Sequence, residues 1–290
     1  MTSGREGTIA LPLILRWLRH LEFPHKLGIC ERLFGDRLSK SGTCWVETAA
    51  GITWKLDLTN PTDRWIIFGK YEGSGFLDWA RSFLPTNGTV VDSGANIGQM
   101  LIYLSQYVPK GKVLAFEPGK EAADWLEECL AAHPELPVEL LRLGLGEREA
   151  RLFLRQVGSK ELHGGRNQIA EGAGEGDAVK VVRLEDVLES QGIDAVDLWK
   201  LDVEGYEVSA LRGAGRLLRE QRIKALYVEL GFGNGERIVD HLAQLGYRCY
   251  LFDSRGRLGL PQHLPEHTNG LFLPVGDAGV GVRESAVYLK

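Results

Sequence analysis

The chain has 290 residues, of which 44% are hydrophobic and 25% are charged, and its formal net charge is −5. A chain of this size can bury a sizeable core without a disulfide framework or a structural metal. The charges form no basic stripe, which argues against a general nucleic-acid binder, so no nucleic-acid partner is expected.

The four cysteines are widely scattered, and none forms a C-x-x-C pair or a Cys/His cluster. This pattern is that of a protein in a reducing compartment, so a cytoplasmic location is expected. The apolar run Ile9–Leu15 is shorter than the roughly 20 residues that cross a bilayer, and we expect no transmembrane segment. It also lacks the basic start and the cleavage site of a signal peptide.

Residues 1–85 differ in pattern from the rest and are predicted to form an N-terminal extension of helices and a β-hairpin. Leu11–Leu38 has interrupted helical periodicity, while Cys44–Leu58 alternates around Gly51 as two strands of a hairpin do. Tyr71–Leu84 is predicted as a helix. An apolar extension of this kind is compatible with a homodimer.

From Thr89 onward, predicted strands and helices alternate, which indicates a second region over residues 86–290. The expected strands are Thr89–Val91, Val113–Phe116, Val138–Leu141, Ala195–Leu201 and Ile223–Glu229. The expected helices are Ile97–Tyr107, Glu121–Ala132, Tyr206–Glu220 and Gly235–Leu245. Such alternation predicts an α/β, Rossmann-like fold with a mostly parallel sheet flanked by helices.

An insertion separates the third and fourth of these strands. Two further strands, Ala150–Val157 and Ala178–Leu184, are expected on either side of a glycine-rich loop from Gly158 to Gly176. Two more strand candidates, Tyr247–Phe252 and Gly270–Leu273, follow near the end of the region.

A nucleotide site is predicted where the first strand of this region ends. The strand ends in Asp92 and turns through Gly94 and Gly98, where a missing Cβ lets the backbone approach a ligand. Glu117 ends the second strand, 19 residues beyond Gly98, and an acidic side chain there can accept hydrogen bonds from a ribose diol. Gly144 after the third strand is expected on the adenine side.

The spacing of the glycines distinguishes between nucleotides. A dinucleotide fingerprint starting at Gly94 needs glycines at positions 96 and 99, where this chain has Asn96 and Gln99. A pyrophosphate also avoids a neighbouring carboxylate, whereas Asp92 suits the sulfonium and amino groups of S-adenosylmethionine. S-adenosylmethionine is therefore favoured over NAD. The predicted cofactor-binding residues are Asp92, Ser93, Gly94, Ala95, Asn96, Gly98, Glu117, Pro118, Gly144 and Asp202.

Three segments in this order resemble the FkbM family of S-adenosylmethionine-dependent methyltransferases. They are VDSGANIG at 91–98, AFEP at 115–118 and KLDVEGYE at 200–207, and the resemblance covers about residues 88–275. It implies a class I methyltransferase fold and O-methylation of a hydroxyl on a sugar or a polyketide-type product. Ser93 stands where a small apolar residue is expected, a mild departure from the pattern.

The chemistry of O-methylation requires the acceptor hydroxyl to lose a proton, either to a general base or on binding a metal. Asp202 and Glu204 follow the fourth strand and are predicted as base or substrate anchor. Alternatively they could bind Mg²⁺ together with Glu229, and Glu204 could simply cap the next helix. His163 in the glycine-rich loop is a further candidate base.

The sequence thus predicts an S-adenosylmethionine-dependent O-methyltransferase that acts on a hydroxyl of a small molecule, glycan or secondary metabolite. Three alternatives remain: a methyltransferase with a nitrogen or peptide acceptor, an NAD-binding oxidoreductase, and a ligand-binding protein without catalysis.

Overall fold

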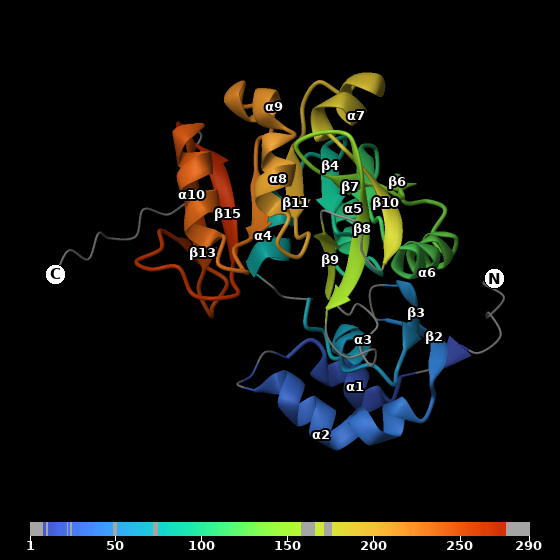
Figure 1. Ribbon diagram of the computed structural model, residues 1–290. Coiled ribbons are helices and arrows are strands. Elements are labelled where there is room, and N and C mark those ends of the chain that lie inside the picture. The colour runs from blue at the N-terminus through green and yellow to red at the C-terminus, as the bar shows by residue number, and fades with distance from the viewer. Residues whose placement is uncertain are drawn as a thin grey trace.

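The structure is a computed structural model, and Figure 1 shows its course from N- to C-terminus. It describes residues 8–9, 11–21, 23, 25–48, 51–71, 75–157, 166–170 and 176–276. None of the helices in these ranges is both long enough and apolar enough to cross a membrane.

An eight-stranded sheet organises the region after residue 86, in the order β14-β13-β15-β12-β11-β4-β5-β6. Its parallel strands are β4 (Thr89–Ser93), β5 (Lys112–Phe116), β6 (Val138–Leu141), β11 (Leu198–Leu201) and β12 (Leu226–Glu229). Its antiparallel strands are β13 (Tyr247–Phe252), β14 (Leu258–Gly259) and β15 (Asn269–Pro274). The order reverses between β4 and β11, which is the topological switch point of a doubly wound sheet. The predicted Rossmann-like, class I methyltransferase fold is confirmed.

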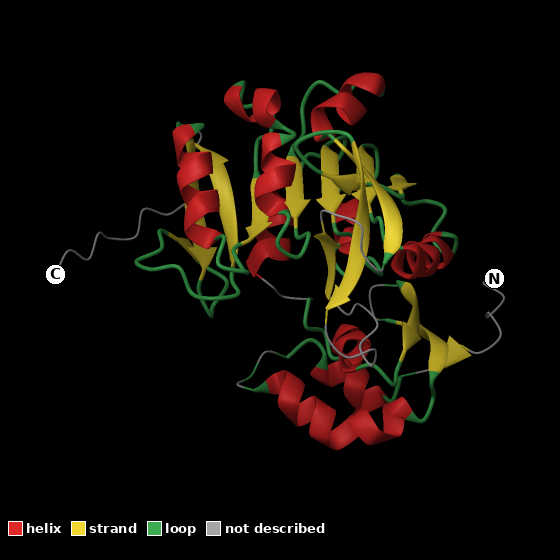
Figure 2. Ribbon diagram, viewed as in Figure 1, coloured by secondary structure: helices red, strands yellow, loops and turns green. Residues whose placement is uncertain are grey.

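Helices cover both faces of this sheet, as Figure 2 shows. Successive strand residues point to opposite faces, so Val90 joins the core on one side and Val91 the core on the other. The first core includes residues of α4 (Gly75–Phe83), α5 (Leu101–Tyr107) and α6 (Lys120–Leu130). The second includes residues of α7 (Leu184–Ser190), α8 (Glu207–Arg212), α9 (Gly215–Arg219) and α10 (Gly235–Gln244).

Several predicted boundaries differ from the structure for local reasons. The helix expected from Ile97 begins only at Leu101, because Asn96 and Gly98 have φ angles of +50° and +91° that no α-helix contains. The helix expected over Tyr206–Glu220 is split into α8 and α9. A seven-residue helix, α7, follows β10 where the sequence pattern predicted no helix.

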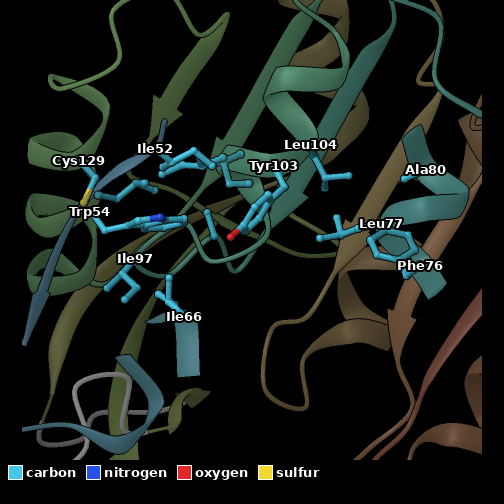
Figure 3. Packing of buried hydrophobic residues seen from close by; sticks show 14 of the residues in the cluster. Ile52, Trp54, Ile66, Phe76, Leu77, Ala80, Ile97, Tyr103, Leu104 and Cys129 are labelled. Carbon is cyan, nitrogen blue, oxygen red and sulfur yellow. The ribbon is translucent and has the colours of Figure 1, made fainter. Parts of the chain in front are cut away.

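The N-terminal extension packs on the same core rather than standing alone. It contains β1 (Thr8–Ile9), α1 (Leu13–Leu18), α2 (Lys26–Ser39), β2 (Thr43–Glu47), β3 (Thr53–Asp57) and α3 (Pro61–Ile67). The predicted hairpin is present as the antiparallel pair β2–β3. Trp54 of β3 lies beside Ile97 and Tyr103 (Figure 3), and the Trp125 Nε1 of α6 donates to the Lys55 carbonyl at 2.6 Å. The extension and the sheet therefore share one hydrophobic core.

Helix α3 was not predicted, although its start has a clear signature. Asn60 accepts a hydrogen bond from the Thr62 backbone N–H at 3.1 Å, and Pro61 occupies the first helical position.

The insertion forms a four-stranded sheet in the order β7-β10-β8-β9. Its strands are β7 (Gly144–Leu145), β8 (Ala150–Val157), β9 (Arg166–Ala170) and β10 (Asp177–Val182). The two predicted strands correspond to β8 and β10, whereas β9 falls in the segment predicted as a loop. This small sheet lies over the carboxyl-end side of β5 and supplies Leu154 and Arg155 to the cavity described below.

Candidate active site

A cavity of about 1230 Å³ opens at the carboxyl ends of β4, β5 and β11. Pockets for one drug-sized ligand occupy about 300–1,000 Å³, so this cavity has room for a cofactor and a second molecule. The turns after these three strands line it, together with β8 and two residues of the extension, Asp63 and Tyr71. It lies at the switch point, where ligands of open α/β sheets bind.

The turn after β4 is built by backbone geometry. Gly94 has a φ of +74°, and a Cβ added to it would lie 1.8 Å from the Asp202 carbonyl oxygen of the β11 turn. The Gly94 and Ala95 N–H groups both donate to the Phe116 carbonyl, at 2.9 and 3.1 Å. The turns after β4, β5 and β11 are thereby joined into one rim.

Glu117 lies at this rim and lines the cavity. Its carboxylate accepts hydrogen bonds from the Asn96 and Gly119 N–H groups, both at 2.8 Å. Burial raises the pKa of Glu117, while these two hydrogen bonds act in the opposite direction. The side chain is thus fixed at the position where a ribose diol is expected.

Asp92 differs from the expectation. Its side chain is only 1% exposed, it is not among the residues that line the cavity, and its Oδ1 lies 3.0 Å from the Lys200 Nζ. Asp92 is therefore not placed to contact a sulfonium directly, because the buried Lys200 ammonium already lies beside its carboxylate.

Lys200 is a site residue that sequence reasoning missed. It lies opposite Asp92 in the β11–β4 register, donates to the Gly94 carbonyl at 3.2 Å, and has its Nζ 3.6 Å from Asp202 Oδ2. Burial alone would lower the pKa of Lys200, but Asp92 and Asp202 raise it above its ordinary value. The sequence does contain a signal for Lys200: it is a lysine within an otherwise apolar strand, and a charge buried in such a strand requires a buried partner.

Asp202 and Glu204 both line the cavity, beside this ion pair. Glu204 has a φ of +54°, a left-handed conformation that is costly for a residue with a long side chain. The N-cap of α8 is Tyr206, with no side-chain cap hydrogen bond, so Glu204 does not have the capping role considered for it. Glu207 instead holds the preceding turn, because it accepts hydrogen bonds from the Val203 and Gly205 N–H groups at 3.1 and 3.0 Å.

Glu229 lies behind the cavity rather than in its lining. Burial and the charges of Asp202, Glu204 and Glu207 raise the pKa of Glu229 to about 8, and its side chain hydrogen-bonds to Asp202. Within the described ranges no three His, Cys, Asp or Glu side chains are arranged to hold a metal ion. The metal site predicted from Asp202, Glu204 and Glu229 is therefore not assembled, because the Lys200 ammonium already neutralises Asp202 on one side.

The remaining predicted residues divide into three groups. Ser93, Ala95, Asn96, Pro118 and Gly144 line the cavity. The Ser93 Oγ also accepts a hydrogen bond from the Trp199 indole at 2.8 Å, so its hydroxyl holds the β11 strand. Gly98 is outside the lining, and a Cβ there would meet Leu126 of α6 at 2.8 Å. His163 lies outside the described residues.

The extension contributes two side chains of different kinds. Asp63 accepts hydrogen bonds from the Asp57 N–H at 2.9 Å and from the Asn60 side chain at 3.1 Å, so it mainly organises α3. Burial raises the pKa of Tyr71 to about 12, so its hydroxyl keeps its proton at neutral pH. Tyr71 can therefore donate a hydrogen bond into the cavity.

Comparison with known proteins agrees with this geometry. The sequence model of the family "Methyltransferase FkbM domain" matches residues 92–249. The chain is 36% identical over 159 residues to Methyltransferase sdnD of Sordaria araneosa, which covers 45% of this chain and 61% of the relative. It is 31% identical over 147 residues to Methyltransferase 1 of Beauveria bassiana, covering 44% and 59%. The chain thus matches about three fifths of the length of these two relatives.

Two solved structures are similar at lower identity. A methyltransferase FkbM of Methylobacillus flagellatus is 21% identical, with a TM-score of 0.46 over 65% of this chain and 44% of that chain. SMU.1697c of Streptococcus mutans, a putative methyltransferase in complex with SAH, is 14% identical, with a TM-score of 0.41 over 68% and 93%.

Proposed function

The chain belongs to the FkbM methyltransferase domain family, and from this we propose that it transfers a methyl group from S-adenosylmethionine to a hydroxyl of a small molecule or sugar. The observation that carries the proposal is the cavity at the switch point, which has two chemically different parts side by side. One is a glycine turn with a fixed carboxylate, Glu117, and the other is a group of side chains after β11.

The residues around the first part fit S-adenosylmethionine. Gly94 lines the cavity and lets the β4 turn pack against the β11 turn, and Glu117 presents a carboxylate that can accept hydrogen bonds from a ribose diol. S-adenosylmethionine, when bound, supplies an electrophilic methyl group on a positively charged sulfur. The carboxylates of Asp202 and Glu204, which line the neighbouring part of the cavity after β11, add negative charge beside it, and this favours a cationic ligand over a pyrophosphate.

For the second part, we assign Asp202 as the group that accepts the proton of the acceptor hydroxyl. Its side chain is 39% exposed and lines the cavity, so an acceptor can reach it. Below a pH of about 8 the Glu229 carboxyl keeps its proton and donates it in a hydrogen bond to Asp202, while Lys200 Nζ lies 3.6 Å from Asp202 Oδ2. These two neighbours fix the orientation of the base, and Tyr71 is placed to hold the acceptor.

The location proposed with this activity is the cytoplasm. All four cysteines are buried and free of disulfides. Burial raises the pKa of the Cys129 thiol to about 11, so it stays in the unreactive protonated form at neutral pH. Thiols of this kind are typical of a reducing compartment.

The first experiment is calorimetric titration of the protein with S-adenosylmethionine, S-adenosylhomocysteine and NAD. Both adenosyl ligands should bind and NAD should not. Glu117→Ala should weaken S-adenosylmethionine binding at least about tenfold, which is the loss of one or two good hydrogen bonds to a charged group. Glu127→Ala is the matched control, because its carboxylate is exposed on α6 outside the cavity.

Binding of NAD alone would overturn the proposal in favour of an oxidoreductase. If the adenosyl ligands bind, a screen of hydroxylated and amine acceptors tests the second half of the proposal. Asp202→Asn should then lower kcat by about 100-fold or more, as expected for loss of a general base, with little change in S-adenosylmethionine affinity. Turnover of amine acceptors only would replace the hydroxyl acceptor with a nitrogen acceptor.

A further inference from the structure

Exposed large apolar side chains are concentrated in one small part of the molecule. Of the eight such residues among the described ranges, six lie between positions 13 and 33. Leu13, Ile14 and Trp17 on α1 are 80%, 57% and 77% exposed, and Leu33 on α2 is 64% exposed. The other two members of this group are Leu21 and Ile29, both 44% exposed. Exposed apolar residues concentrated in this way indicate a binding surface.

The exposure does not come from loose helices. Leu15 of α1 and Cys30 of α2 are each 1% exposed and belong to the shared core. Between the two helices, the Lys26 Nζ donates to the Arg19 carbonyl at 2.7 Å, and Arg19 in turn donates to the Ile66 carbonyl of α3 at 3.4 Å. Each helix is therefore docked by one face and leaves its opposite, apolar face uncovered.

The position of these helices leaves that face accessible. Figure 1 shows α1 and α2 at the end of the molecule farthest from the eight-stranded sheet, with α3 between them and the sheet. None of the exposed apolar residues lines the cavity, so the surface is separate from the proposed active site.

The charges among these side chains identify the occupant. The exposed charged residues on α1, on α2 and at the end of α2 are four basic ones and one acidic one: Arg16, Arg32, Arg37, Lys40 and Asp36. The exposed charges of this segment thus sum to 4 − 1 = +3, on a chain whose net charge is −5. A short helix with tryptophan and leucine on the apolar side and arginine at its edges is typical of binding in the plane of a membrane interface.

We propose that α1 and α2 bind the surface of an anionic lipid bilayer, with Leu13 and Trp17 entering the interface and Arg16 and Arg32 facing the headgroups. The helices lie on the bilayer without crossing it. This inference does not rest on the proposed methyltransferase activity.

The test is co-sedimentation of the full chain with vesicles of phosphatidylcholine, with and without phosphatidylglycerol. The wild type should bind the anionic vesicles, and added salt should weaken binding because it screens the headgroup charge. The double variant Leu13→Ser/Trp17→Ser should bind at least about tenfold more weakly, because two large apolar contacts are lost. Arg16→Glu/Arg32→Glu should reduce binding to the anionic vesicles by about tenfold or more.

Leu260→Ser is the matched control, because Leu260 is 63% exposed but lies outside α1 and α2. It should bind vesicles as the wild type does. The Leu13→Ser/Trp17→Ser protein should keep the wild-type unfolding midpoint and S-adenosylmethionine affinity, since both side chains are exposed and distant from the cavity. A failure of cofactor binding in the wild type would therefore contradict the proposed function and leave the vesicle result unaffected.

Quenching by brominated lipids gives a second readout. The tryptophan fluorescence of the wild type should be quenched by vesicles that contain these lipids. Trp17→Phe should remove that quenching while the protein still binds the vesicles. The proposal is overturned if the wild type does not bind anionic vesicles, or if Leu13→Ser/Trp17→Ser binds them equally well. A third outcome also overturns it: the wild type is a dimer that does not bind vesicles, and Leu13→Ser/Trp17→Ser dissociates this dimer. That outcome would assign the surface to a second copy of the chain.

Discussion

The two sides of the switch point are built in different ways. On the β4–β5 side, backbone conformation makes the site: Gly94 and Asn96 have positive φ angles, and Glu117 accepts two backbone hydrogen bonds. On the β11–β12 side, side-chain charges make it: Lys200 lies between Asp92 and Asp202, and Glu229 hydrogen-bonds to Asp202.

The two halves of the proposed reaction are therefore specified by different kinds of residue. A backbone turn serves any ligand with the same adenosyl group, and it is specified by a few adjacent residues. A charge arrangement has to match one acceptor, and it depends on residues from three separate segments, β4, β11 with its following turn, and β12. We expect substitutions on the first side to act through shape and those on the second through charge.

The largest effect is expected from Gly94→Ala. The new Cβ would lie 1.8 Å from the Asp202 carbonyl oxygen at a φ of +74°, so the β4 and β11 turns would have to separate. We expect a loss of about 4 kcal/mol in the free energy of unfolding, measured in urea, and no detectable S-adenosylmethionine binding. Gly192→Ala is the control: its φ is +67° with no atom within 4 Å, so it should cost about 1 kcal/mol. Equal losses in the two variants would show that the close approach does not matter.

Lys200→Met tests the charged side of the comparison. It leaves Asp92 buried without its cation and should cost about 3 kcal/mol of stability, part of which Lys200→Met/Asp92→Asn should restore. The same substitution at Lys224, which pairs with Asp197 at 2.6 Å but is 54% exposed, should cost at most about 1 kcal/mol. Thermal or urea unfolding of the four proteins gives the comparison. A double variant no more stable than Lys200→Met would argue against a specific pair.

The pH dependence of stability should depend on Glu229. Its pKa is raised from 4.5 to about 8, so the native state keeps a proton that the unfolded state releases. Stability therefore falls as pH rises from about 4.5 to about 8, and Glu229→Gln should reduce this fall by roughly 1–2 kcal/mol, allowing for solvent screening. Urea unfolding across this pH range measures it, with Glu189→Gln, 71% exposed, as the control. A slope that Glu229→Gln leaves unchanged would assign the fall to other buried carboxyls.

The smallest effect on stability is expected from Glu204→Gly. Glycine relieves the left-handed strain at a φ of +54°, so we expect a gain of about 0.5 kcal/mol in unfolding free energy. If the Glu204 carboxylate contacts the acceptor, KM for the acceptor should rise in the same variant. Gln221→Gly removes similar strain at a φ of +50°, far from the cavity lining, and should leave turnover unchanged. A Glu204→Gly enzyme with normal kinetics would reduce Glu204 to a structural role.

The same division explains what could be predicted from the sequence. The parallel strands and the glycine turn follow from local patterns, because apolar runs and glycines act on their neighbours. Lys200 with Asp92 could have been found from the sequence, since two charges in adjacent apolar strands must pair when buried. Tyr71 could not, because its place in the cavity depends on how the extension packs, which no local pattern records. The predicted metal site of Asp202, Glu204 and Glu229 was wrong for a related reason, because spacing along the chain gave no sign of the Lys200 ammonium beside Asp202.

The strand order of the sheet has a consequence for synthesis on the ribosome. β15, the last strand among the described residues, pairs antiparallel with both β12 and β13 and lies between them. While the chain is being made, β12 and β13 therefore each have an open hydrogen-bonding edge until residues 269–274 emerge. Nascent chains in this interval expose two open strand edges, and during this period aggregation or chaperone binding competes with folding. Completion of the sheet is thus delayed until the final segment inserts between strands that were translated before it.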